Sequence, residues 1–210
     1  MSTETILIAF GLTLFAGLST GIGSMLAFFT KRTNTKFLST SLGFSAGVMI
    51  YVSFMEMMPQ AKSNLLESFG DRVGTIYLLL AFFGGMGLIT LIDFLIPEDK
   101  NPHEMHSVEE LSMKQPRLKK TGMMVALSIG IHNFPEGIAT FTSALNSLEI
   151  ALPITAAIAI HNIPEGIAVS VPIYQATGDK KKAFTLSFLS GMAEPVGALF
   201  GFLILLPFWT

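Results

Sequence analysis

The sequence predicts an all-α integral membrane protein, and three observations lead to this fold class. Hydrophobic residues make up 50% of the 210 residues, and the mean hydropathy is +0.59. Charged residues make up 13%, about half of the share of about 25% that is usual in soluble domains. Apolar runs of about 20 residues, the length that a membrane-spanning helix needs, alternate with short polar stretches along the chain.

The composition also excludes several classes of protein. The 13 Lys and Arg residues nearly balance the 15 Asp and Glu residues, so no basic surface points to nucleic acid. The sequence has no cysteine, which excludes disulfides and thiolate metal sites. We expect residues 1–210 to form a single transmembrane domain.

Six transmembrane helices are predicted from the apolar runs. The first run has no basic N-terminal region, which favours a retained helix over a cleaved signal peptide. The six predicted spans cover residues 4–29, 38–61, 74–96, 121–145, 150–175 and 183–208.

The basic residues indicate the orientation of these spans. Eleven of the 13 Lys and Arg residues lie in the first, third and fifth loops, and the second loop has Lys62 and Arg72 alone. Because positive charge is retained on the cytoplasmic side, the N-terminus is predicted to lie outside. The third loop, residues 97–120, is then cytoplasmic. It carries His103 and His106 in "HEMH", for which a metal-sensing role and simple solvation both remain open.

Two nearly identical motifs lie inside predicted spans. "IHNFPEGIAT" begins at Ile131 in the fourth span, and "IHNIPEGIAV" begins at Ile160 in the fifth. His132 lies 11 residues beyond Thr121, His161 lies 10 residues beyond Ala151, and Glu194 lies 11 residues beyond Ala183, each counted from near the start of its span. At a rise of 1.5 Å per residue this depth is about 16 Å, the middle of the bilayer. Polar residues at that depth are costly and usually mark a substrate path or a relay, whereas interhelical hydrogen bonding is the plainer alternative.

Helix geometry predicts what these residues can hold. Glu136 lies about 40° around the helix from His132, between His132 and Asn133, and the second motif repeats this spacing. If the polar faces of the two helices face each other, two imidazoles and two carboxylates form one metal position. Two amide oxygens, with the same carboxylates acting as bridges, form a second. The predicted ligands of this binuclear site are His132, Asn133, Glu136, His161, Asn162, Glu165 and, at the second position, Glu194.

The predicted ligands suit first-row divalent metals. Imidazole with carboxylate fits Zn, Fe(II), Mn or Co, and the absence of thiolate argues against Cu(I). Calcium and magnesium prefer oxygen ligands and do not require histidine. We expect no cofactor, and one or two such ions bound as cargo.

A proline lies within each motif. Pro135 and Pro164 lack the N–H that would bond the carbonyl groups of Ile131 and Ile160, so both helices are predicted to kink. Kinked or broken helices at the midplane are how many secondary transporters build their sites.

These residues resemble a known family. "HNFPEGIA", "HNIPEGIA", "SLGFSAGVMIYVSFMEMMP" in the second span and "SGMAEP" in the sixth closely resemble the ZIP (Zrt/Irt-like) divalent metal transporters, in particular their bacterial zinc importers. The resemblance covers nearly the whole chain. It implies a bacterial-type cell (inner) membrane and import of Zn(II), often with Fe(II), Mn(II), Co(II) or Cd(II), through the binuclear site. The residues carried over by position are the seven named above.

The chain departs from the family in length. The family has eight spans with both termini outside, and the predicted sixth span here ends at "LLPFWT". Three explanations remain open: a fragment, a partner chain that supplies the missing helices, or a degenerate relative. The expected partners are divalent metal ions, the lipid bilayer and a second copy of the chain.

Glu56 and the possibility of catalysis give two further predictions. Glu56, near the outer end of the second span, could attract cations into an entrance or lie at the level of the lipid headgroups. An intramembrane hydrolase is the alternative function, with His132 and His161 holding zinc and a glutamate activating water. No HExxH arrangement supports it, and we expect a transporter rather than an enzyme. A non-transporting metal-binding protein is the third alternative.

Overall fold

A computed structural model describes residues 2–28, 35–95 and 115–205, and these residues are almost entirely helical, without a strand. The predicted all-α class is therefore confirmed. The elements are α1 (Thr3–Ala27), α2 (Thr35–Val52), a π-helix η1 (Ser53–Met57), α3 (Met58–Leu95), α5 (Gln115–Asn146), α6 (Leu148–Thr177), α7 (Lys180–Gly191) and α8 (Ala193–Leu205).

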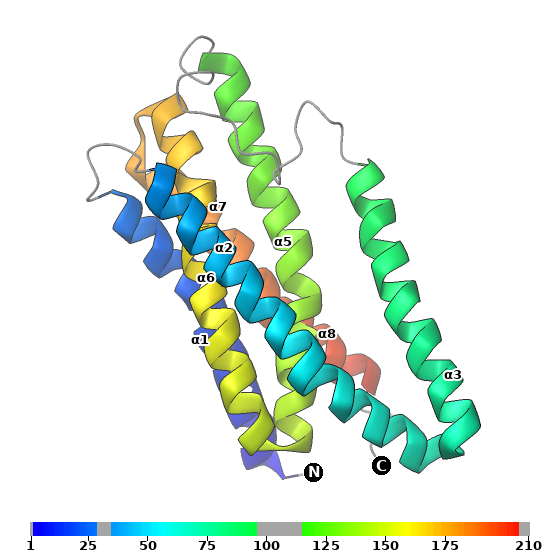
Figure 1. Cartoon of the computed structure of the whole chain (residues 1–210). Helices are drawn as coiled ribbons and strands as arrows, with labels where there is room; N and C mark the ends of the chain where they lie inside the picture. Colours follow the sequence, from blue (N-terminus) through cyan, green and yellow to red (C-terminus); the bar gives the residue numbers. More distant parts are fainter. Residues whose placement is uncertain (1, 29–34, 96–114, 206–210) are drawn as a thin grey trace.

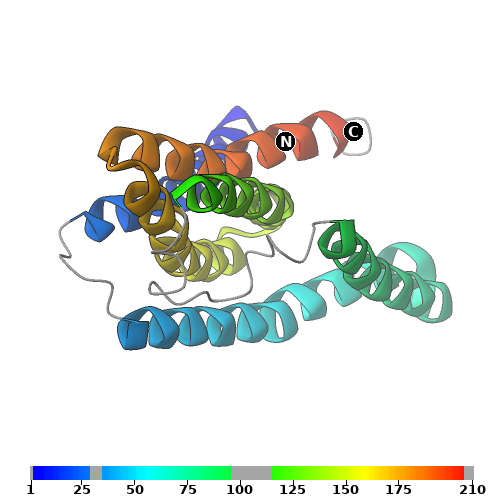
Figure 2. The same ribbon diagram turned by 90° about the horizontal axis from the view of Figure 1, so that it is seen from above.

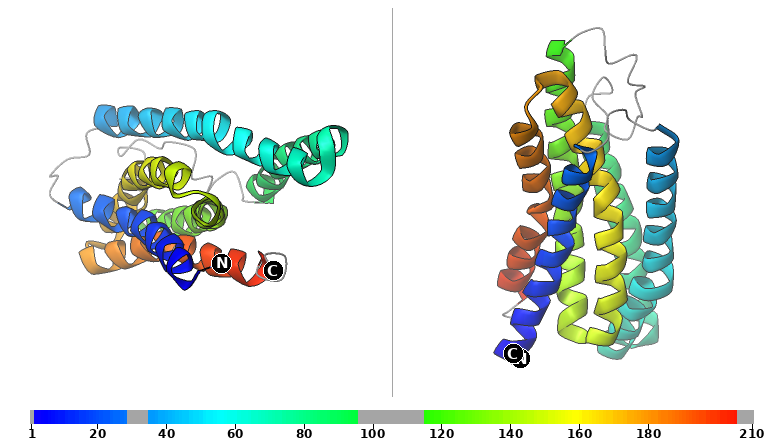
Figure 3. Two further views of the ribbon diagram at one scale, coloured as in Figure 1. Left: turned by 90° about the horizontal axis from the view of Figure 1, so that it is seen from below. Right: turned by 90° about the vertical axis from the view of Figure 1, so that its left-hand side faces the viewer.

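The helices form a bundle with an outlying pair. Helices α1, α5, α6, α7 and α8 pack against one another, with α6 and α5 at the centre (Figure 1). Helix α2 packs against α6, and α2 and α3 together lie along one side of the bundle (Figures 2 and 3). Most large apolar side chains of α2 and α3 are exposed, as expected for surfaces that face lipid or another protein.

Apolar clusters flank the level of the two motifs along the bundle. One cluster lies toward the C-terminal end of α5, beyond the first motif, and consists of Ala9, Phe141, Ala144, Ala151 and Ala198. Another, preceding the motif along α5, consists of Val125, Ala126, Val169, Ile173 and Ala183. The motif residues lie between these clusters along both α5 and α6, so the polar layer is enclosed by apolar packing.

Several helix boundaries differ from the predicted spans. The second and third predicted spans belong to one nearly continuous helical stretch, interrupted at Gly70, whose φ of 75° is open to glycine without strain. Helix α5 begins at Gln115 rather than at residue 121, so the end of the predicted loop 97–120 is helical. The sixth predicted span consists of two helices, α7 and α8, separated at Met192.

Four helical stretches of the described residues are long and apolar enough to cross a membrane: Thr3–Leu26, Ser39–Leu91, Leu148–Thr177 and Lys180–Ile204. The stretch Ser39–Leu91 contains most of two predicted spans. Helix α5, whose first turns are rich in polar residues, is not among the four. The chain is thus a multi-pass membrane protein, and Pro135 and Pro164 lie inside helices that continue past them.

Candidate metal site

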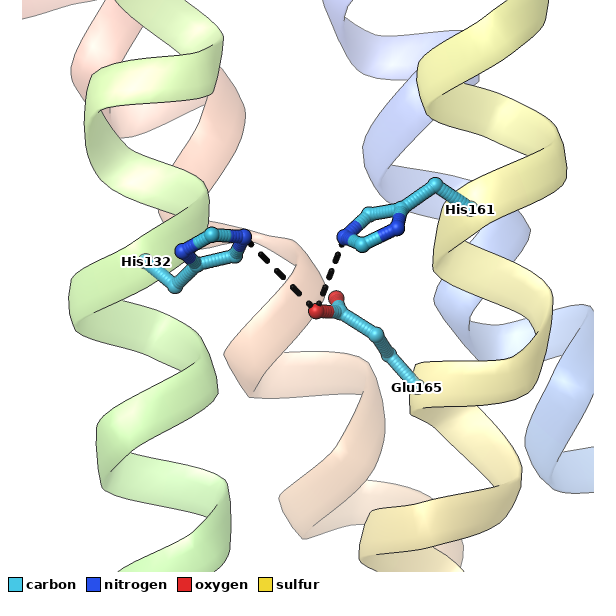
Figure 4. A group of neighbouring side chains, drawn as sticks. All are labelled: His132, His161 and Glu165. Carbon is cyan, nitrogen blue, oxygen red and sulfur yellow. Dashed lines mark ion pairs between the residues drawn. The ribbon is translucent and has the colours of Figure 1, made fainter. Parts of the chain in front are cut away.

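Two histidines and two glutamates from the repeated motifs meet between α5 and α6. Both imidazole rings point toward the carboxylate of Glu165 (Figure 4). Nε2 of His161 lies 3.1 Å from Glu165 Oε1, and Nε2 of His132 lies 4.0 Å from the same oxygen. Ligand atoms of His132, His161 and Glu165 all lie within 4.8 Å of one another, so one cation could contact all three.

Glu136 occupies the matching place on α5. Its Oε1 lies 3.3 Å from Nε2 of His132 on its own helix and 3.9 Å from Nε2 of His161 on α6. Each carboxylate therefore approaches both imidazoles. The His132 side chain is 40% exposed, whereas that of His161 is 13% exposed and both carboxylates are 10% exposed. The cluster is thus open on the side of His132.

The spacing of each motif explains the contacts within a helix. Residues four apart lie on one face of a helix, which places Glu136 beside His132 and Glu165 beside His161. The glycine after each carboxylate explains how neighbouring helices come so close. A Cβ on Gly137 would overlap the backbone of Glu194 in α8, and a Cβ on Gly166 would overlap the backbone of Thr20 in α1.

A second polar group lies beside the first. Asn133, Asn162 and Glu194 are fully buried. The Asn162 amide donates to Glu194 Oε1 and, at 2.8 Å, to the carbonyl oxygen of Ala16. The Asn133 amide lies 3.1 Å from Glu165 Oε2, and its nitrogen donates to that oxygen when the amide is oriented to satisfy it. This contact joins the second group to the carboxylate of the first.

Glu194 reaches this position because the sixth predicted span is broken. Helix α7 ends at Gly191, and Glu194 lies in the first turn of α8. A carboxylate is favoured there because unpaired N–H groups give a helix N-terminus partial positive charge. The sequence signal for the break was the "GMAEP" stretch, since Gly191 and Pro195 are typical of helix boundaries.

Several buried oxygen atoms in the site have no donor. Oε2 of Glu136, Oδ1 of Asn162 and Oε2 of Glu194 lack a hydrogen-bond partner within the described part of the chain. A buried acceptor without a partner costs about 1–3 kcal/mol. Buried acceptors without donors are groups that a nearby cation would stabilise.

Sequence reasoning missed one neighbour of the cluster. Ser45 of α2 contacts Nδ1 of His161 through its hydroxyl oxygen, and it is buried. The stretch "GFSAG" around it carried no titratable group and gave no indication of this contact, which depends on how α2 packs against α6.

The remaining predicted residues lie apart from the cluster or outside the described residues. Glu56 lies in the π-helix η1 and lines a cavity of about 540 Å³ between α2 and α6, together with Tyr51, Pro153 and Ile160. His103 and His106 lie outside the described residues.

Comparison with known proteins adds an independent finding. Residues 96–206 match the model of a family described as "ZIP Zinc transporter". Proteins named "Zinc transporter ZupT" are 61% identical in Streptococcus mutans, over 95% of this chain and 75% of the relative, and 60% identical in Lysinibacillus sphaericus, over 98% and 78%. A third, from Clostridium perfringens, is 56% identical over 96% of this chain and 76% of its own length.

Proposed function

This chain belongs to the ZIP zinc transporter family, and we propose that it carries Zn(II) into the cytoplasm through the His–Glu cluster between α5 and α6. The family consists of transporters, as predicted, and not of enzymes. The observation that carries the proposal is the convergence of His132, His161 and Glu165 within 4.8 Å.

The distances in the first position suit zinc. With zinc–ligand bonds of about 2.0–2.2 Å in a tetrahedral site, neighbouring ligand atoms lie about 3.3–3.6 Å apart. The four histidine-to-glutamate distances range from 3.1 to 4.0 Å, so modest side-chain rotation would complete the geometry. Fe(II), Mn(II), Co(II) and Cd(II) are further proposed cargo, because imidazole and carboxylate ligands do not choose sharply among them.

A second metal position is proposed beside the first. Its ligands would be Asn133, Asn162 and Glu194, with Glu136 and Glu165 as bridges. The unpaired oxygens of Glu136, Asn162 and Glu194 support this position, since each is a buried acceptor that a neighbouring cation would stabilise. An Asn133 oxygen turned toward Glu165 Oε2 would be repelled without a cation and favoured with one.

The proposed path starts at Glu56. Its carboxylate lines the same cavity as Ile160, the residue that precedes His161. A carboxylate at an entrance raises the local concentration of cations. The arriving ion would exchange its water for the imidazole and carboxylate ligands.

The proposal includes six membrane crossings. These are α1, the helical stretch up to Gly70, the rest of α3, α5, α6, and α7 with α8. The helices alternate in direction along the bundle, which supports this count (Figure 1). With the basic loops on the cytoplasmic side, the N-terminus lies outside a bacterial-type inner membrane. The exposed apolar faces of α2 and α3 fit lipid and a second copy of the chain in a homodimer.

The test is uptake of radiolabelled zinc into liposomes that contain this chain, with equilibrium zinc binding measured on the same samples. His161→Ala should abolish uptake and weaken binding, whereas His106→Ala, in the 97–120 segment, serves as the matched control and should do neither. Uptake by the His161→Ala protein at the normal rate would contradict the proposed site. Binding without uptake in the unmodified chain would identify the metal-binding alternative without transport.

A further inference from the structure

Ser45 is an unusual residue on α2. Among the described side chains of this helix, Ser45 and Val52 alone are buried, with Ser45 1% exposed. Its neighbours Phe44, Ala46 and Gly47 are exposed. A buried hydroxyl on a mostly exposed helix requires a polar partner, since an unpaired one would be destabilising.

The partner is a proposed metal ligand. The Ser45 hydroxyl oxygen contacts Nδ1 of His161 and lies 3.5 Å from the carbonyl oxygen of the same residue. A hydroxyl can accept one hydrogen bond while it donates another. Ser45 can therefore accept from Nδ1–H of the ring and donate to the His161 carbonyl oxygen.

The opposite ring nitrogen faces the carboxylates. Nε2 of His161 lies 3.1 Å from Glu165 Oε1. A metal on Nε2 requires that nitrogen to carry the lone pair, so the ring hydrogen must reside on Nδ1. The group that accepts from the other ring nitrogen orients the ligand and fixes its tautomer. We propose that Ser45 is the positioning residue of His161, holding the ring so that Nε2 points into the zinc site.

His132 offers a contrast within the same cluster. Its side chain is 40% exposed, and no described residue forms a hydrogen bond with its Nδ1. The two histidines, equivalent in sequence, are thus held differently. His161 is held at Nδ1 by α2, whereas the contacts of His132 with described residues are made at Nε2, with Glu136 and Glu165. The inference rests on the proposed function, because it requires Nε2 of His161 to bind zinc.

The test is a double-mutant cycle on zinc affinity, measured by calorimetry with purified full-length chain. Ser45→Ala should weaken zinc binding roughly ten-fold, the low end of the 10–100-fold loss typical when such a supporting partner is removed. In a His161→Ala background, Ser45→Ala should produce no further loss. Ser45→Thr, which keeps the hydroxyl, should restore most of the affinity.

Ser19→Ala is the matched control. Ser19 is 2% exposed, and its hydroxyl donates to the carbonyl oxygen of Phe15 in its own helix. The Ser19→Ala substitution removes a buried hydroxyl, as Ser45→Ala does, but should leave zinc affinity unchanged. A spectroscopic readout completes the test: the zinc-loaded chain should show a slowly exchanging Nδ1–H signal for His161 that disappears in Ser45→Ala.

Two results would overturn the inference. One is an unchanged affinity in Ser45→Ala, and the other is an equal loss from Ser45→Ala with and without the His161 ring. If Ser45→Ala does not fold, the Ser45→Thr chain provides the test. A folded, zinc-loaded Ser45→Thr chain without the Nδ1–H signal would also overturn the inference. Normal zinc affinity in His161→Ala would instead contradict the proposed function itself.

Discussion

The carboxylate of Glu194 accepts a hydrogen bond from the side-chain amide of Asn162, and neither residue is exposed. The contact joins α8 to α6 at the level of the repeated motifs. Oε2 of Glu194 and the side-chain amide oxygen (Oδ1) of Asn162 have no donor within the described residues. This pair therefore offers two buried acceptors that a second cation could use.

Glu194→Gln should reduce the number of bound zinc ions from two to one. Glutamine keeps the size of the side chain but removes the charge that a second cation needs. The first position, built on the two histidines, should keep its affinity within a few-fold. The measurement is metal stoichiometry by elemental analysis of the purified protein. Two ions bound per chain in the variant would contradict the binuclear arrangement.

Glu136→Ala should lower zinc uptake by at least about a hundred-fold relative to the unmodified chain, which corresponds to about 2.7 kcal/mol. This loss should exceed that of Glu194→Gln. Glu136 lies 3.3 and 3.9 Å from the two imidazoles, so its removal would take a proposed ligand from the first position and the proposed bridge from the second. Initial uptake rates in liposomes measure the effect. Glu149→Ala, an exposed acid in the first turn of α6, is the control. Normal transport by Glu136→Ala would exclude bridging.

Zinc uptake should weaken as the external pH falls from about 8 to about 5, because zinc binds neutral imidazole and ionised carboxylate, and protons compete for both. The sign follows directly: binding releases protons, so a higher proton concentration opposes it. Initial uptake rates across this range, with zinc activity buffered at each pH, provide the measurement. A flat profile would show that the histidines and glutamates are not the groups that bind the ion.

The sequence predicted the parts of the site that depend on spacing within one helix. A separation of four residues places Glu136 beside His132 whatever surrounds the helix, and the structure has them 3.3 Å apart. The depth argument likewise brought Glu194 to the level of both motifs. The contact within one helix needs helix geometry alone, and the structure has Glu194 in contact with Asn162 of the second motif.

Features that depend on packing between helices were not predictable from the sequence. The hydroxyl of Ser45 contacts His161 because α2 lies against α6, and nothing in the spacing of "GFSAG" indicates that contact. The break at Met192 was not predicted, although "GMAEP" contains Gly191 and Pro195, because residues 183–208 are apolar enough to be read as one span. The chain turns at Gly70, inside the stretch that separates the predicted spans 38–61 and 74–96, but the sequence did not indicate that one residue with positive φ would make this turn.

Gly166→Ala should destabilise the bundle, because it adds a methyl group where α6 packs directly against the backbone of α1. A Cβ there would overlap the carbonyl oxygen of Thr20, and the backbone of α1 could yield only by moving away from α6. The carbonyl oxygen of Gly166 also accepts hydrogen bonds from Ser24 at 3.3 Å and Ser187 at 3.2 Å, which such a movement would lengthen.

Overpacking of this kind costs about 1–3 kcal/mol, so the melting temperature of the zinc-free Gly166→Ala protein in detergent should fall by several degrees. Gly84→Ala is the matched control, because a Cβ at Gly84 meets no atom within 4 Å and alanine is the better helix former. Its melting temperature should stay the same or rise slightly. A Gly166→Ala chain as stable as the Gly84→Ala chain would mean that α1 and α6 do not approach closely at this glycine.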